Sequence, residues 1–226
     1  MTEPAIGAFD GASPAAHAEA ERSRARLARP EPVVLTGRTV RLEPLAPEHE
    51  AALTEAGRSP EIWRYTLSPM GAELMQPYLA KALADRDAGT ALPFAVCHLG
   101  DGRLIGCTRY LDISPEHRSL EIGFTWYAPE YWRTAVNTEC KHLLLRHAFE
   151  VLGCVRVEFR ANAQNLRSRT AIARLGAVEE GTLRSEWLRP DGSRRDVTYF
   201  SILDHEWPAV QARLERMLER TPEDGG

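Results

Sequence analysis

The residues that most clearly suggest chemistry lie between Glu121 and Glu139, where an alternating strand runs through a loop into a helix. The first turn of a helix leaves several backbone N–H groups without partners, at the positive end of the helix dipole. Such a turn binds phosphate readily, and Arg133 adds a fork-shaped cation beside it. The pattern therefore predicts a phosphate-binding turn. The alternative is an ordinary helix start with solvated charges.

Hydrophobic periodicity predicts the elements that would position this turn. Strands are expected at about residues 39–43, 92–99, 104–111, 120–127, 155–161, 178–188 and 196–203. Helices are expected at 47–57, 73–88, 136–152, 165–175 and 206–218, with Gly153 and Gly176 as the C-terminal stops of the third and fourth. This order predicts an α/β or α+β sheet with one parallel pair of strands around the long helix.

Composition places the chain among ordinary globular proteins and excludes several functions. Of 226 residues, 28 are basic and 32 acidic, which gives a formal net charge of −4. No basic excess exists to neutralise phosphates, so we do not expect a nucleic-acid partner. The longest stretch without a charged side chain, residues 88–100, is shorter than the roughly 20 residues of a membrane span. Neither a membrane association nor a secretory leader is expected.

The cysteines and the two ends of the chain give further expectations about location and domain bounds. Cys97, Cys107, Cys140 and Cys154 lie among apolar residues without metal-ligand spacing. They are typical of buried thiols in a reducing compartment, so we expect a cytoplasmic protein without a metal site. Residues 1–32 show no apolar stripe and are expected to form a flexible arm. Residues 33–220 would form one domain, and residues 221–226 a disordered tail.

Residues 121–139, 158–177 and 180–184 resemble, in the same order, motifs of the GCN5-related N-acetyltransferase family. The similarity spans roughly residues 36–208 and is nearest to the branch that acetylates the N-termini of ribosomal proteins. It implies acetyl-CoA as the acetyl donor. It also implies a mixed, mostly antiparallel sheet of seven strands flanked by helices. The central parallel strands of that sheet would splay apart to admit the pantetheine arm.

The resemblance also implies which residues bind acetyl-CoA. The backbone of Phe124, Thr125 and Trp126 would pair with the pantetheine amides. The pyrophosphate would bind at the start of the long helix, at Arg133, Thr134, Ala135, Val136, Asn137 and Thr138. The family pattern there, Q/R-x-x-G-x-G/A, has Trp132, Ala135 and Asn137 at its three marked positions. Because Ala and Asn lack the freedom of glycine, we expect binding to be retained by a stiffer loop.

Asn165 matches the family asparagine that contacts the cofactor after the fifth strand, although it is also well suited to cap a helix. The tyrosine that many members use as a general acid is replaced by Ile172. Ser168, one turn after Asn165, is then the hydroxyl best placed to hydrogen-bond the departing thiolate. The alternative for Ser168 is a solvent-facing serine in the first turn of the helix.

Acetyl transfer also needs a base to make the attacking amine neutral. Glu121 and Glu158 lie on the two strands expected to splay, and either could accept the amine proton directly or through water. The alternative for each is an ion pair with a neighbouring arginine, of which Arg109, Arg156 and Arg160 are in reach across the sheet.

The sequence therefore predicts an acyltransferase that moves an acetyl group from acetyl-CoA to a primary amine by direct attack. The acceptor would be a protein N-terminus or a small amine, and Trp63 and Tyr65 are the aromatic residues that could line its cleft; the alternative for the aromatic residues is the core. The rival hypothesis is a non-catalytic acyl-CoA-binding regulatory module, favoured by the altered glycines and the missing tyrosine. The resemblance also favours a homodimer.

Overall fold

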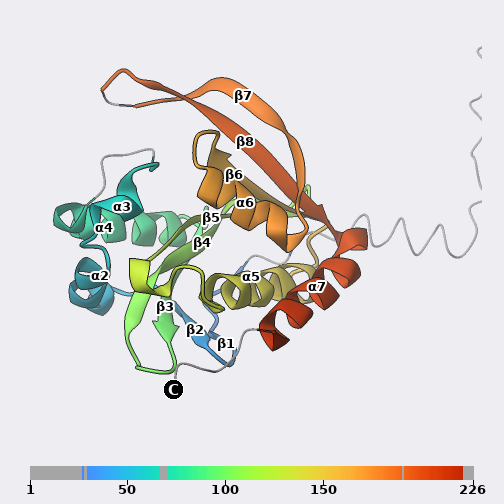
Figure 1. Cartoon of the computed structure of the whole chain (residues 1–226), viewed down its shortest axis with the longest axis horizontal. Helices are drawn as coiled ribbons and strands as arrows, with labels where there is room; N and C mark the ends of the chain where they lie inside the picture. Colours follow the sequence, from blue (N-terminus) through green and yellow to red (C-terminus); the bar gives the residue numbers. More distant parts are fainter. Residues whose placement is uncertain (1–26, 28–29, 67–70, 190, 221–226) are drawn as a thin grey trace, which may run out of the picture.

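The computed structural model describes residues 27, 30–66, 71–189 and 191–220, which form one open sheet flanked by helices (Figure 1). The strand order is β1-β2-β3-β4-β5-β6-β8-β7. The strands are β1 (Leu35–Thr36), β2 (Val40–Pro44), β3 (Leu92–His98), β4 (Leu104–Ser114), β5 (Ser119–Tyr127), β6 (Arg156–Asn162), β7 (Val178–Leu188) and β8 (Arg194–Leu203). Among these described strands, only β5 and β6 pair in parallel. The predicted mixed sheet is confirmed, with the two-residue β1 as an eighth strand in addition to the expected seven.

Helices cover both faces of the sheet (Figure 1). One face carries α2 (Glu50–Ala56), α3 (Pro60–Trp63) and α4 (Met75–Asp87), and the other carries α5 (Val136–Arg146), α6 (Leu166–Leu175) and α7 (Trp207–Glu219). Short 3-10 turns lie at Pro47–His49, Ala72–Leu74, Pro129–Tyr131 and Asp204–Glu206. The helix expected at 136–152 is α-helical to Arg146 and continues as a π-helical turn, His147–Val151.

The strands divide their apolar side chains between two cores because successive residues point to opposite faces. The larger core lies under α5, α6 and α7 and includes Phe94, Leu120, Phe159 and Phe200. The smaller core lies under α2, α3 and α4 and includes Cys107 and Trp126. All four cysteines are buried and free, as the sequence predicted.

The parallel strands β5 and β6 separate near the middle of the sheet. They pair only at Ser119–Arg156, Leu120–Val157 and Glu121–Glu158, although β5 continues to Tyr127 and β6 to Asn162. Beyond Glu121, β5 pairs with β4 alone among the described strands, so one edge of its backbone is open. The predicted splay is therefore confirmed.

A bulge lies on β5 just beyond the point of separation. Gly123 and Trp126 pair with Arg109 and Cys107, so three steps on β5 match two steps on β4. Phe124, inside this bulge, has a left-handed φ of 48°. A bulge re-aims the side chains around it, and Phe124 is 51% exposed.

The β7–β8 hairpin reaches past the body of the sheet towards α3 (Figure 1). Near its end, Arg189 Nη2 donates a 2.7 Å hydrogen bond to the carbonyl oxygen of Thr66, just after α3. The hairpin and the α3 segment therefore meet on the face that carries α2, α3 and α4.

Most of the expected arm and all of the expected tail lie outside the described residues. Leu27 is an exception: its side chain is buried in the larger core and its backbone N–H donates to the Pro115 carbonyl. Among the described helices, none combines the length and apolar character needed to cross a bilayer.

Candidate active site

Glu121 lies at the last paired position of β5, where the strands begin to separate. Its side chain is buried and shares its face of the sheet with Glu158 and Arg160. Arg160 Nε lies 3.2 Å from Glu121 Oε2, without the alignment of a hydrogen bond. Burial raises the pKa of Glu121 to about 7, and the positive charge of Arg160 only partly opposes this. A carboxylate with this pKa can take up and release a proton near neutral pH.

Glu158 has a different environment from Glu121, although the two residues are register partners. One oxygen accepts a hydrogen bond from Arg156 at 2.9 Å, and the other accepts from Arg160 at 2.9 Å. Both oxygens are therefore held by guanidinium groups. Of the two candidate bases, Glu121 is the one whose carboxylate is not fully engaged.

Lys141, on α5, approaches the separated strands from the other face. Its Nζ donates to the Thr125 hydroxyl at 2.6 Å and lies 5.9 Å from the centre of the Phe159 ring on β6. The Thr125 hydroxyl also lies 2.8 Å from that of Thr108. Burial lowers the pKa of Lys141 to about 8, an effect that Cys140 and Glu121 oppose. A buried cation thus lies beneath the bulge on β5.

The turn between the end of β5 and α5 carries backbone N–H donors that are not used within the described structure. Ala135, Asn137 and Thr138 have backbone N–H groups without acceptors among the described residues. Val136 differs, because its N–H donates to the Thr134 hydroxyl and its side chain lies in the larger core.

The departures from the glycine pattern carry no backbone strain. Ala135 has φ −65° and ψ −20°, an ordinary helical geometry, and Asn137 lies within α5. The left-handed residue of this turn is Arg133, with φ 65°. Its neighbour Trp132 is stacked under the guanidinium of Arg167, 3.7 Å from the ring centre.

Asn165 caps α6, which confirms one of the two roles predicted for it. Its Oδ1 accepts from the backbone N–H of Ser168 at 3.1 Å, so its side-chain amide group remains available. The Ser168 side chain is half-buried, and its hydroxyl has no partner among the described residues. Ile172 lies in the core.

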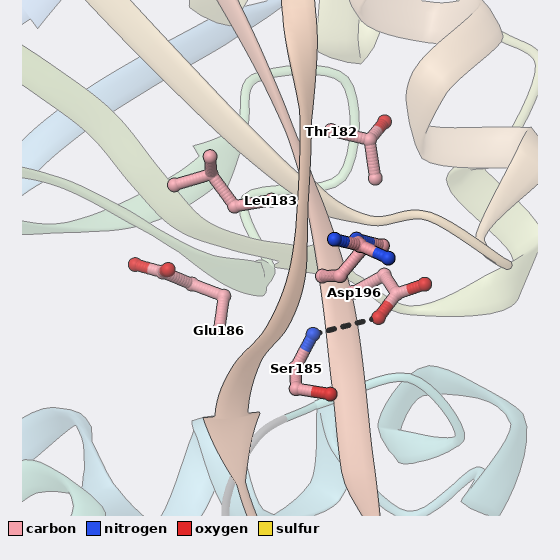
Figure 2. A pocket seen from close by; sticks show the side chains of 6 residues that line it. Thr182, Leu183, Ser185, Glu186 and Asp196 are labelled. Atoms are coloured by element: carbon pink, nitrogen blue, oxygen red, sulfur yellow. Dashed lines mark hydrogen bonds between the residues drawn. The ribbon is translucent and has the colours of Figure 1, made fainter.

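A hollow of about 690 Å³ lies along the β7–β8 hairpin, lined by Thr182, Leu183, Arg184, Ser185, Glu186 and Asp196. Asp196 accepts from the Ser185 backbone N–H at 2.8 Å (Figure 2). Glu186 accepts from the Tyr199 hydroxyl at 3.0 Å, and Arg160 stacks on the Tyr199 ring. A chain of contacts thus connects the hollow to Glu121. Glu186 contacts Tyr199, the Tyr199 ring stacks on Arg160, and Arg160 lies beside Glu121.

Two features differ from the sequence analysis. Trp63 does not line an open cleft: it is buried in the smaller core, 5.0 Å from the Trp126 ring, and donates to the Gly57 carbonyl. Tyr65 is half-buried. Lys141 was not singled out, because Glu139 and His142 close to it make it look like an ordinary polar position of the helix.

Comparison with models of known protein families identifies the family of this chain. The model of the acetyltransferase (GNAT) domain matches residues 39–178. The chain belongs to this family. The match includes β2 to β6, α5 and α6, and hence Glu121, the β5–β6 separation and the turn before α5.

Solved structures of this family superpose closely on the chain. A GCN5-related N-acetyltransferase from Brucella melitensis is 30% identical, with a TM-score of 0.81 over 89% of this chain and 92% of that one. A protein of T. thermophilus, provisionally described as an acetyltransferase, is 38% identical, with a TM-score of 0.76 over 84% of this chain and 98% of that one. RimJ of Mycobacterium smegmatis, solved with CoA-disulfide, shares the fold at 23% identity, with a TM-score of 0.70 over 82% and 95%.

One curated relative extends this comparison. The Bacillus subtilis (strain 168) protein provisionally named ribosomal N-acetyltransferase YdaF is 35% identical over 109 residues. The matched region spans 48% of this chain and 58% of the length of that relative.

Proposed function

We propose that this GNAT-family chain transfers an acetyl group from acetyl-CoA to a primary amine by direct attack. The observation that carries the proposal is the position of Glu121, whose pKa is raised to about 7 where β5 and β6 separate. Bound acetyl-CoA would supply an acetyl group activated as a thioester. The family membership and the residues around the separation support this assignment.

Three groups of residues fit acetyl-CoA. The open edge of β5 at Phe124, Thr125 and Trp126 offers backbone groups to the pantetheine amides. The free N–H groups of Ala135, Asn137 and Thr138, with Thr134 and Arg133 beside them, suit a pyrophosphate. Asn165 offers its side-chain amide from the start of α6. Val136 would pack below this turn rather than contact the phosphates.

Glu121 acts as the general base in this proposal. It takes a proton from the ammonium form of the acceptor, directly or through water, so that the neutral amine can attack the thioester carbonyl. Glu158 keeps Arg160 in place beside Glu121. As the carbon–sulfur bond breaks, the nitrogen loses its second proton to water and the sulfur takes the electron pair. The Ser168 hydroxyl donates a hydrogen bond to the sulfur, or a proton that it regains from water.

The charged groups near Glu121 are nearly balanced. Asp112, Glu121 and Glu158 converge on Arg160, while Arg156 also binds Glu158 and Arg109 lies on the same face, so these charges do not select the acceptor. A protein N-terminus is the acceptor we propose, since the YdaF relative is named a ribosomal N-acetyltransferase. A small amine is the alternative. A cytoplasmic location, supported by the four free and buried cysteines, and a homodimer, supported by family resemblance, complete the proposal.

Reversing the charge of Arg133 should weaken acetyl-CoA binding strongly. We expect wild-type protein at about 100 times the dissociation constant to gain about 2.7 kcal/mol, or ~5–11 °C in melting temperature. Arg133→Glu should lose most of this shift because it places a negative charge beside the pyrophosphate. The control is Arg58→Glu, at an exposed arginine that forms a surface ion pair with Glu55. Equal dissociation constants for the two variants by calorimetry would contradict the pyrophosphate site, and an unshifted wild type would contradict the proposed function.

Removing the Ser168 hydroxyl should slow turnover without weakening the cofactor. We expect Ser168→Ala to lower kcat on the order of a hundredfold, the low end for general acid catalysis, with an unchanged acetyl-CoA dissociation constant. Thr170→Ala, at an exposed hydroxyl of the same helix, is the matched control. A loss of less than threefold would assign the proton to solvent, and a parallel loss of affinity would make Ser168 a cofactor-positioning residue.

A further inference from the structure

Arg109, on β4, is a buried cation whose guanidinium is within hydrogen-bonding reach of the Tyr78 hydroxyl but has two further nitrogens without partners in the described part of the chain. Its side chain is only 4% exposed, and neither Nε nor Nη2 has a partner among the described residues. The guanidinium lies between two rings, 4.9 Å from the centre of Tyr78 and 4.3 Å from that of Phe124. Burying an N–H donor without an acceptor costs free energy, so each such donor in a native protein needs a physical explanation.

The backbone register places Arg109 beside the proposed base. Arg109 pairs with Gly123 across the β4–β5 ladder, and Leu111 pairs with Glu121. Arg109 and Glu121 are therefore diagonal neighbours on one face of the sheet, with Cα atoms about 7–8 Å apart.

Gly123 provides the space between these two side chains. A Cβ at this position would lie 2.6 Å from Glu121 Oε1 and 3.0 Å from Leu111 Cδ2. The carboxylate of Glu121 thus lies over Gly123, directly across the ladder from Arg109. The cation and the base share one side of the sheet without forming an ion pair with each other.

The two rings that enclose Arg109 differ in how firmly they are held. Tyr78 is buried in the smaller core, where its hydroxyl accepts from Trp126 Nε1 at 3.4 Å. Phe124 is half exposed at the bulge and packs its ring on the guanidinium. Rotation of the Phe124 side chain alone would open Arg109 towards solvent without disturbing the core.

We propose that Arg109 binds the carbonyl or carboxylate oxygen adjacent to the amino group of an α-amino acceptor. The amine lies at Glu121 while the neighbouring oxygen takes the free N–H groups of Arg109. This inference rests on the proposed function and narrows it: the site selects α-amines of peptides or amino acids over polyamines and simple alkylamines.

The experiment compares two acceptors that differ in one oxygen. The first is a tripeptide amide that begins with alanine, and the second is its alkene isostere, in which the first peptide bond is replaced by a carbon–carbon double bond. Free alanine is a third probe, which separates a carboxylate from a peptide carbonyl. Affinity is measured by calorimetry on the full chain saturated with CoA, and kcat/KM is measured with acetyl-CoA.

Wild-type protein should bind the peptide about 10–100-fold more tightly than the isostere, the value of a hydrogen bond to a charged group. In Arg109→Met, which keeps an unbranched stem between the rings, this preference should fall to about twofold while isostere affinity is unchanged. Arg109→Lys should restore part of the preference. Tighter binding of alanine than of the peptide would identify a free amino acid as the preferred form.

Equal wild-type affinity for the peptide and the isostere would overturn the proposal, whatever the variants do. A loss of both affinities in Arg109→Met would also overturn it, because that result indicates a structural role. Failure of the proposed function gives a different result: no amine is acetylated, while the carbonyl preference in binding is still measurable.

Discussion

Glu121→Gln should lower kcat/KM for amine acetylation by about 10²–10⁴-fold, because the glutamine cannot accept the amine proton. The loss should be seen with acetyl-CoA affinity within twofold of wild type, measured by calorimetry. The wild-type kcat/KM should rise with pH through about 7, the pKa to which burial raises Glu121. In the variant the rise should shift upward to the pKa of the acceptor amine itself, about 7.7–8.0 for a peptide α-amine, because only amine that is already neutral can then attack.

The same substitution should not destabilise the fold near pH 8. The pKa of Glu121 is raised on folding from 4.5 to about 7, so the folded protein holds this proton more tightly than the unfolded chain. Stability from this group is therefore present at low pH and is lost as the pH rises through this range. Glutamine stays neutral and avoids the loss, so the melting temperature should stay equal or rise.

Glu158→Gln is the matched control for Glu121→Gln. It lies at the register partner of Glu121, but its carboxylate is held by Arg156 and Arg160. We expect a smaller loss of kcat/KM and a pH profile that still rises through about 7, since Glu121 is intact. A larger effect for Glu158→Gln than for Glu121→Gln would exchange the roles assigned to the two carboxylates.

Glu139→Ala should have the largest effect on stability, with a loss of about 3 kcal/mol in the free energy of unfolding. The buried Glu139 carboxylate accepts three backbone N–H groups, from Arg38, Thr39 and Val40, at 2.7–2.8 Å. Alanine would leave these donors without their acceptor and open a cavity. The melting temperature should fall by ~6–12 °C.

Glu55→Ala provides the comparison for this prediction. Glu55 is exposed and forms a surface ion pair with Arg58, so its loss should cost less than about 1 kcal/mol. Equal shifts for the two variants in thermal unfolding would show that Glu139 does not anchor the β1–β2 turn. Gly37 should also resist substitution, because a Cβ there has no room beside the Glu139 carboxylate.

Local patterns in the sequence predicted most of the fold. Alternation around Leu120 and Ile122 predicted β5, the stripe through Cys140 and Leu144 predicted α5, and Gly176, with φ 112°, ends α6 as expected. The splay of β5 and β6 followed from family resemblance, because a break in pairing between strands distant in sequence leaves no periodic signal. The two-residue β1 is too short to be recognised from alternation.

The site was predicted less completely because its chemistry depends on side chains that meet only in the folded chain. Sequence alone left Glu121 and Glu158 equivalent, and only the positions of Arg156 and Arg160 distinguish them. Trp63 was expected at a cleft because its short helix, α3, was read as a loop. Lys141 and Arg109 were not predicted as site residues. Lys141 contacts Thr125 and Arg109 contacts Phe124, and both contacts depend on a bulge in β5 that the sequence did not predict.

The central claim is tested most directly by the release of free CoA thiol when the protein is incubated with acetyl-CoA and a tripeptide amide beginning with alanine. We predict thiol release above the peptide-free rate, an equal amount of N-acetylated peptide by mass spectrometry, and loss of both signals in Glu121→Gln. A protein that binds acetyl-CoA yet releases no thiol above background with peptide or small-amine acceptors would contradict this account. That result would identify the chain as a non-catalytic acyl-CoA-binding module.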